Sequence, residues 1–291
     1  MTRWIKIIIR AAKAWNADNA FKHSAAVSFY TLFSVAPVTI IAIKVMGIFL
    51  GEDVATRQFS AQMTALVGPA SAEMIQAAAA ASKAPAASGF SAALGVILLL
   101  VGATTVFGQL QGSLNDIWGV EAKPRGHGIF VLVMRRLVSF AMALTIGFLL
   151  LVSLVLSTML TATLGMIHGR IGTAPLLIKG IDFAATLAVI TTLFALLFKV
   201  LPDVRLQWRD VWVGAALTAL LFSLGRYLIA LYVGHSTVAS IYGTAAALVA
   251  LLVWIYYSCA IFFFGAEFTR AHHLTHHPAI RPKTAAVHVR S

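Results

Sequence analysis

Long apolar runs separated by short polar connections dominate this chain of 291 residues. Six runs are long enough for a helix to cross about 30 Å of hydrocarbon, which takes about 20 residues. The third run is the cleanest, and the first is interrupted by hydroxyl side chains, a proline and a lysine. The predicted spans lie near residues 25–50, 90–114, 137–166, 178–200, 211–233 and 244–268. This pattern predicts an all-α integral membrane protein built as a bundle of six transmembrane helices.

A basic segment with a different period precedes the first span. Cations recur in it at spacings of three and four residues, which places them on one face of a helix. They are Arg3, Lys6, Arg10 and Lys13, and the residues opposite are Trp4, Ile8, Ala11 and Trp15. The pattern predicts an amphipathic helix within residues 1–22 that lies in the membrane interface, with its cations toward anionic headgroups. A helix packed on its own bundle gives the same pattern, and both interpretations place it at the cytoplasmic face.

The rest of the chain divides into a membrane domain, residues 23–270, and a tail, residues 271–291. One connection in the membrane domain is long, residues 51–89, and its alanine-rich sequence predicts two short helices on the outer side. The tail is basic and rich in histidine. We expect it to be cytoplasmic and disordered from about Pro278, since it is short and polar.

Composition supports a membrane protein, and the positions of the charges orient it. The chain is 60% hydrophobic and 11% charged, against about 45–50% and about 25% in soluble domains. Of the 22 lysines and arginines, sixteen fall in the termini and loops of one predicted side and four on the other. Because cytoplasmic loops carry the excess of positive charge, both termini are predicted to be cytoplasmic. The same loops explain the net charge of +12 without a nucleic-acid partner.

Three ionisable residues, Lys44, Asp182 and Arg226, are predicted inside spans at similar depths in the outer half of the bilayer. Such residues cost about 2.5–3.5 kcal/mol each on insertion scales and usually face the bundle interior or a wet cavity. A structural salt bridge between Asp182 and one cation fits the pattern. Two cations against one carboxylate also fit a cavity for an anionic group such as a phosphate. Tyr242, at the start of the last span, would then help to shape its outer mouth.

Hydroxyl side chains form a stripe along the first span. Ser24, Ser28, Thr31 and Ser34 recur at spacings of four and three residues. Pro37 follows them and is expected to kink the helix. Such a stripe either lines a path for water or headgroups or lets neighbouring helices pack closely.

The predicted cytoplasmic ends of the spans hold further polar features. Gly108 and Gly112 are four residues apart, a spacing typical of close helix packing. Asp116 and Glu267 stand at two of these ends, where many cations gather, and salt bridges are predicted for both.

The run AHHLTHHP, residues 271–278, holds two pairs of histidines four residues apart. On a helix this spacing can hold a divalent ion. No cysteine or carboxylate stands nearby in the sequence to complete such a set. We therefore expect no metal and no cofactor, and a stretch that faces lipid headgroups.

Signatures of catalysis are missing from the sequence. It contains no P-loop, no GxSxG, no HExxH and no pair of cysteines. We expect no enzyme, no catalytic residue and no ATPase within the chain. A membrane-embedded hydrolase would need a nucleophile and a base, and the nearest pair, Ser28 with His23, is spaced five residues apart, which does not align them on a helix.

Five quoted segments carry a resemblance to a known family. They are SAAVSFYTLFSVAPV (24–38), VFGQLQGSLNDIWGV (106–120), LPDVRLQWRDVWVGA (201–215), FSLGRYLIALYVG (222–234) and IYGTAAALVALLVWIYYSCAIFFFGAEFTR (241–270). In this order they resemble the YihY/BrkB family of bacterial inner-membrane proteins, from about residue 20 to residue 272. The resemblance implies six helices, cytoplasmic ends, and a link to virulence and to lipid traffic in the envelope. Some members carry a ribonuclease BN label, which does not suit this sequence because it lacks clustered His and Asp ligands on a soluble fold.

The function expected from these features is binding and translocation of an anionic amphiphile, a phospholipid or a related envelope lipid. Arg226 and Lys44 would attract the headgroup, Asp182 would tune them, and the hydroxyl stripe would line the route. The alternative is a non-transporting scaffold for envelope or virulence machinery, in which Arg226 is structural. The expected partners are membrane lipids, with envelope proteins as further partners, and no nucleic acid.

Overall fold

The computed structural model describes residues 3–67, 72–73, 75–77, 105–122, 175–235, 246–277, 279–283 and 286–288. It is mostly helical, as the sequence predicts. The labelled helices are α1 (Arg3–Ala17), α2 (Ala20–Leu50), α3 (Glu52–Val67), α7 (Pro175–Val200), α8 (Trp208–His235) and α10 (Ala246–His276). Residues 105–118 form another helix. The third predicted span lies outside the described residues.

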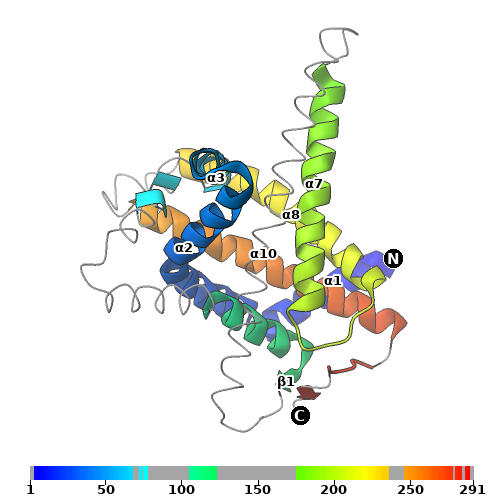
Figure 1. Ribbon diagram of the computed structural model, residues 1–291. Coiled ribbons are helices and arrows are strands. Elements are labelled where there is room, and N and C mark those ends of the chain that lie inside the picture. The colour runs from blue at the N-terminus through cyan, green and yellow to red at the C-terminus, as the bar shows by residue number, and fades with distance from the viewer. Residues whose placement is uncertain are drawn as a thin grey trace, which may run out of the picture.

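Helix α10 is the common partner of its neighbours. Helices α1, α2 and α8 each pack against it, and α7 packs against α8. Figure 1 shows α10 crossing the middle of the molecule while α7 stands at a steep angle to it. The main core contains residues of α2, α7, α8, α10 and the helix of residues 105–118, and its largest members include Trp118, Phe198, Phe262 and Phe263.

One described helix has the length and composition of a membrane span. Leu248–His276, 29 residues of α10, is long and apolar enough to cross a bilayer, and Thr186–Val200 of α7 is a shorter apolar helix. Among the residues that the structure describes, no other helix meets this test. The count of six spans is therefore not confirmed and stays a prediction.

The first two helices are separated by a sharp turn. Asn19 has φ 53°, in the left-handed region that asparagine tolerates better than most residues. Helix α1 then packs on α10 through Ile7 and Ala11, which are buried with Phe268. Helix α2 continues through position 37 as one helix of 31 residues. The face of α1 that packs on α10 includes Ile7, which was not part of the predicted apolar face. Ile8, which was part of that face, is exposed.

The described parts of the tail, residues 279–283 and 286–288, pack against the rest of the molecule, and here the structure differs from two predictions. Strand β1 (Val120–Ala122) pairs antiparallel with β2 (Ala286–His288), so the fold is not purely helical. The expected disordered tail instead docks on the loop 201–207: the Arg205 N–H donates to the Arg281 carbonyl and the Lys283 N–H to the Asp203 carbonyl, each at 2.8 Å. Helix α10 also extends to His276, past the predicted start of the tail at residue 271. Hydrogen bonds to residues far away in the sequence thus satisfy backbone groups of the tail, and the tail's own sequence does not predict these partners.

Candidate functional site

The predicted cationic cavity is only partly described. Arg226 and Asp182 lie in α8 and α7, but their side chains, like the whole of Tyr242, lie outside the described residues. Lys44 lies in α2, and its side chain is exposed. The convergence of these groups on one cavity therefore stays a prediction.

The hydroxyl stripe of α2 is bonded to its own helix. Ser24, Ser28 and Ser34 are buried and Thr31 is half-buried. Each hydroxyl donates to the carbonyl four residues earlier, at 2.7 to 2.9 Å. Because this bond satisfies the hydroxyl within its own helix, the residue can lie in a contact between helices. The geometry supports the packing interpretation, and the route for headgroups stays a prediction.

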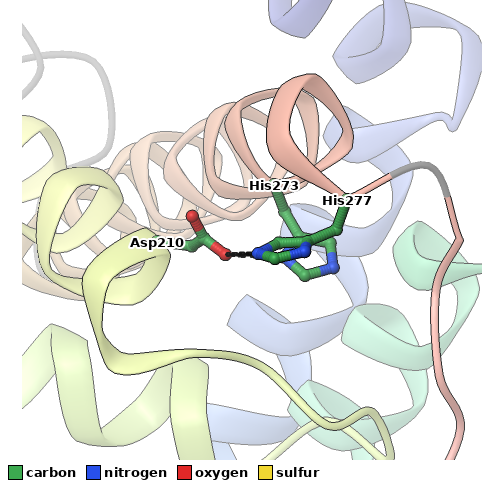
Figure 2. Close-up of side chains that lie close together, drawn as sticks. All are labelled: Asp210, His273 and His277. Atoms are coloured by element: carbon green, nitrogen blue, oxygen red, sulfur yellow. Dashed lines mark hydrogen bonds and ion pairs between the residues drawn. The ribbon is translucent and has the colours of Figure 1, made fainter.

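Polar side chains gather where α8 begins and α10 ends. Asp210 lies in the first turn of α8, and four histidines occupy the end of α10 and the residue after it. Asp210 Oδ2 lies 2.6 Å from His273 Nδ1, and Asp210 Oδ1 lies 3.3 Å from His272 Nδ1. Both histidines and Asp210 are buried. Figure 2 shows the carboxylate of Asp210 pointing at the His273 ring, with the His277 ring beside it.

Two sets of potential metal ligands share this carboxylate. One set is Asp210, His273 and His277, and the other is Asp210, His272 and His276. Within each set the ligand atoms lie within 4.8 Å of one another. His277 Nε2 lies 4.0 Å from Asp210 Oδ2, and its side chain is 37% exposed.

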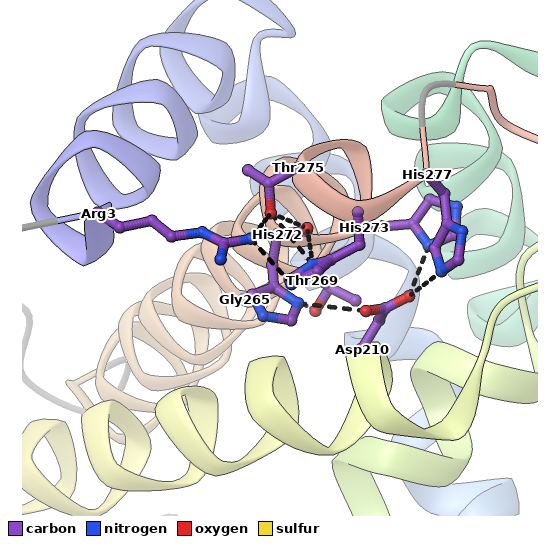
Figure 3. Close-up of polar contacts among 9 residues, drawn as sticks. Arg3, Asp210, Gly265, Thr269, His272, His273, Thr275 and His277 are labelled. Carbon is purple, nitrogen blue, oxygen red and sulfur yellow. Dashed lines mark hydrogen bonds and ion pairs between the residues drawn. The ribbon is translucent and has the colours of Figure 1, made fainter.

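Helix α1 reaches the second set. Arg3 Nη2 lies 2.8 Å from His276 Nε2 and donates to Thr275 Oγ1 at 3.3 Å. The Trp4 ring stacks on His272, with centroids 5.7 Å apart. Figure 3 shows Arg3 extending from α1 toward the end of α10, on the side away from His277.

The structure differs from the sequence analysis of the histidine run in two respects. The sequence has no carboxylate near it, but the fold brings in Asp210 from 63 positions before His273. His272 and His273 are buried, so they do not face headgroups. One sequence feature could have indicated this contact, because Asp210 and the histidines fall on the same predicted side of the membrane.

A second charged cluster lies one to two turns before the histidines in α10. Arg270 Nη1 is 2.9 Å from Asp18 Oδ2 and 3.6 Å from Glu267 Oε2. Glu267 is fully buried, and it lies within ion-pair distance of Arg270, as predicted. Asp116, the other acid for which a pair was predicted, lies 3.9 Å from His23 Nε2 and is largely exposed.

A third polar cluster joins the loop 201–207 to the helix of residues 105–118. The Asn115 amide donates to Asp203 Oδ2 at 2.9 Å and accepts from the Asp203 N–H at 2.8 Å. Lys283 Nζ donates to the Pro202 carbonyl at 2.7 Å. Burial lowers the pKa of Lys283, and the Asp203 carboxylate opposes this effect. The predicted cytoplasmic segments thus meet at one end of the molecule.

A helix long and apolar enough to cross a bilayer, α10, packed among further helices and with polar clusters at its end, fits the class of helical membrane proteins. Within this class, the chain belongs to the family described as Virulence factor BrkB, which matches residues 11–288. The resemblance seen in the sequence is therefore confirmed.

Relatives of known sequence support the same class. The chain is 27% identical to a UPF0761 membrane protein of Alkalilimnicola ehrlichii over 275 residues, 92% of this chain and 59% of that protein. It is also 27% identical to one of Chromohalobacter salexigens over 270 residues, 91% of this chain and 63% of that protein. The chain thus spans about three fifths of the length of these relatives. No solved structure matches it.

Proposed function

We propose that the chain binds an anionic amphiphile of the membrane, a phospholipid or a related envelope lipid, and translocates it without an ATPase of its own. The observation that carries this proposal is the exposed surface of α1. It combines cations with large apolar side chains, and its exposed members are Arg3, Lys6, Arg10, Lys13, Trp4, Ile5, Ile8 and Ile9. Such a surface inserts apolar groups beside headgroups while its cations attract anionic lipid.

The attachment of α1 to α10 links this surface to the bundle. Ile7 and Ala11 are buried against α10, and the Trp15 indole N–H donates to the Ala260 carbonyl at 3.1 Å. A lipid held by α1 would thus lie beside the helix on which α2 and α8 also pack. In this proposal the bundle has six spans in a bacterial inner membrane, with both ends in the cytoplasm. Arg226 and Lys44 attract the headgroup further out, and Asp182 tunes them.

Translocation in proteoliposomes tests the proposal. Purified protein is reconstituted with a fluorescent anionic phospholipid, and a membrane-impermeant quencher reports the outer leaflet. We expect faster translocation than in protein-free vesicles, and a slower rate for Arg226→Gln at matched reconstitution. A rate equal to that of protein-free vesicles would contradict translocation, and a full rate in folded Arg226→Gln would remove the arginine from the mechanism.

The alternative function is a scaffold for envelope machinery. It is favoured by the described part of the tail, where β1 pairs with β2 and residues 281 and 283 bond to loop 201–207. These contacts present a fixed surface, and pre-organised surfaces change little when they bind a partner protein. A scaffold would be folded and would show no lipid translocation in the same assay.

A further inference from the structure

The Asp210 cluster has the donor set of a transition-metal site. Imidazole nitrogens and a carboxylate oxygen are ligands that Zn²⁺ accepts in tetrahedral sites. His273 and His277 are one helical turn apart at the end of α10, and their ring centroids lie 4.8 Å apart. This spacing presents two imidazoles on one side of the chain, while Asp210 arrives from α8.

The distances suit an ion after small side-chain movements. Ligand atoms about 2.0–2.1 Å from a tetrahedral Zn²⁺ lie about 3.3 Å from one another. Asp210 Oδ2 is 2.6 Å from His273 Nδ1 and 4.0 Å from His277 Nε2, so the observed separations fall on both sides of that value. His277 is partly exposed, and its ring can move inward. The buried Trp118 ring packs edge-on against His273 and limits the movement of that ligand.

The position of Arg3 favours the set of Asp210, His273 and His277 over the set that contains His276. A guanidinium only donates hydrogen bonds, so His276 Nε2, 2.8 Å from Arg3 Nη2, is the acceptor of that contact. That nitrogen is therefore occupied, and the positive charge beside it opposes a cation. The set with His273 and His277 lies on the other side of Asp210 (Figure 3).

His272 contacts the second oxygen of the same carboxylate. Its Nδ1 lies 3.3 Å from Asp210 Oδ1 and is buried, yet it makes no hydrogen bond to any residue that the structure describes.

We propose that Asp210, His273 and His277 bind one Zn²⁺, which ties the start of α8 to the end of α10. His273 ligates through Nδ1 as a neutral imidazole, so its ring proton then lies on Nε2. Three protein ligands leave the fourth position to water or to an external ligand. The site stands independently of lipid translocation, because none of its residues belongs to the predicted cavity.

The test is metal binding by the full chain purified in detergent without a polyhistidine tag. Chelator-treated protein is titrated with Zn²⁺, and with Co²⁺, whose visible absorption reports tetrahedral coordination. The wild type is compared with His277→Ala and with Asp210→Asn. His276→Ala is the matched control, because it removes a histidine from the same stretch but outside the proposed set. Circular dichroism and gel filtration confirm that each variant is folded.

We expect one equivalent of Zn²⁺ in the wild type and in His276→Ala. Affinity should fall by at least about tenfold in His277→Ala and in Asp210→Asn, since loss of even an outer partner of a metal ligand costs about 10- to 100-fold. Equal affinity in His277→Ala, or no binding by folded wild type, would overturn the proposal and leave an Asp210–His273 ion pair. Loss in His276→Ala alone would place the ion on the other set and would overturn this assignment.

Discussion

Thr269 of α10 lies directly against Gly214 of α8, where any side chain larger than hydrogen would overlap it. The relationship is reciprocal, because Thr218 of α8 lies against Gly265 of α10 in the same way. Each threonine hydroxyl donates to the carbonyl of the glycine in its own helix, at 2.7 Å. The hydroxyls are thereby satisfied, and the two helices approach as closely as their backbones allow.

We expect Gly214→Ala to separate α8 from α10 and to lower stability by about 1–3 kcal/mol, the usual cost of overpacking a tight contact. Gly112→Ala is the matched control: Gly112 is helical and exposed, and an added Cβ would meet nothing within 4 Å. Alanine there should be neutral or stabilising, because it favours helix by about 0.5–1 kcal/mol over glycine. Denaturation of the detergent-solubilised variants measures the difference. Wild-type stability in Gly214→Ala would show that the contact is not tight.

The same pair of helices shows what helical spacing can and cannot predict. Apolar runs predicted the positions of α2, α7, α8 and α10 to within several residues, because long apolar helices depend mainly on local sequence. Gly214 and Thr218, and Gly265 and Thr269, are each spaced four apart, as are Gly108 and Gly112. The spacing places residues on one face, but only tertiary packing decides what meets that face. At Gly108 and Gly112 nothing described lies within 4 Å, so the close contact expected there is not found among the described residues.

The candidate metal site was beyond the sequence for a similar reason. His273 and His277 are visible as an i, i+4 pair, but their carboxylate stands 63 positions before His273, in another helix. The docked tail was missed because its backbone bonds run to Asp203 and Arg205, far away along the chain. Contacts between residues so far apart along the chain produce no periodic pattern in the sequence.

Arg270 is expected to offset the burial of Glu267. Arg270→Ala removes a guanidinium that lies 2.9 Å from Asp18 Oδ2 and 3.6 Å from Glu267 Oε2, and loss of a hydrogen bond to a charged group costs about 1.5–3 kcal/mol. Adding Glu267→Gln should change this loss, because it replaces the acid that Arg270 contacts. Unfolding free energies of the wild type, both single variants and the double variant form a cycle that measures this coupling. Strictly additive effects would contradict a direct interaction.

Asn115 is expected to hold the loop that receives the tail. Asn115→Ala removes two hydrogen bonds to Asp203. We expect a loss of about 1–3 kcal/mol, at about 0.5–1.5 kcal/mol for each bond. Gln111→Ala is the control, since Gln111 makes one longer bond, of 3.3 Å, to the same carboxylate.

Hydrogen exchange of the tail amides measures the effect of Asn115→Ala. Its amides, with those of loop 201–207, should exchange hydrogen faster in Asn115→Ala, because Lys283 donates to the carbonyl of Asp203. Exchange in α10 should not change. Unchanged protection of residues 279–288 would show that the tail docks without this asparagine.

The exposed cations of α1 are expected to set the preference for anionic lipid. Each lysine or arginine near an anionic surface contributes about 1 kcal/mol, or about fivefold in affinity. Replacing Lys6, Arg10 and Lys13 with Gln, one at a time and together, should therefore weaken binding of an anionic phospholipid stepwise. Native mass spectrometry of the detergent-purified protein measures lipid occupancy, with phosphatidylcholine as the neutral reference.

Arg57→Gln is the control, because it removes the same charge from α3, on the predicted outer side. The stepwise loss should shrink at high salt, since exposed charges are screened within about 10 Å at 0.1 M ionic strength. Equal losses from Arg57→Gln and from a single α1 variant would mean that net charge, rather than the surface of α1, selects the lipid.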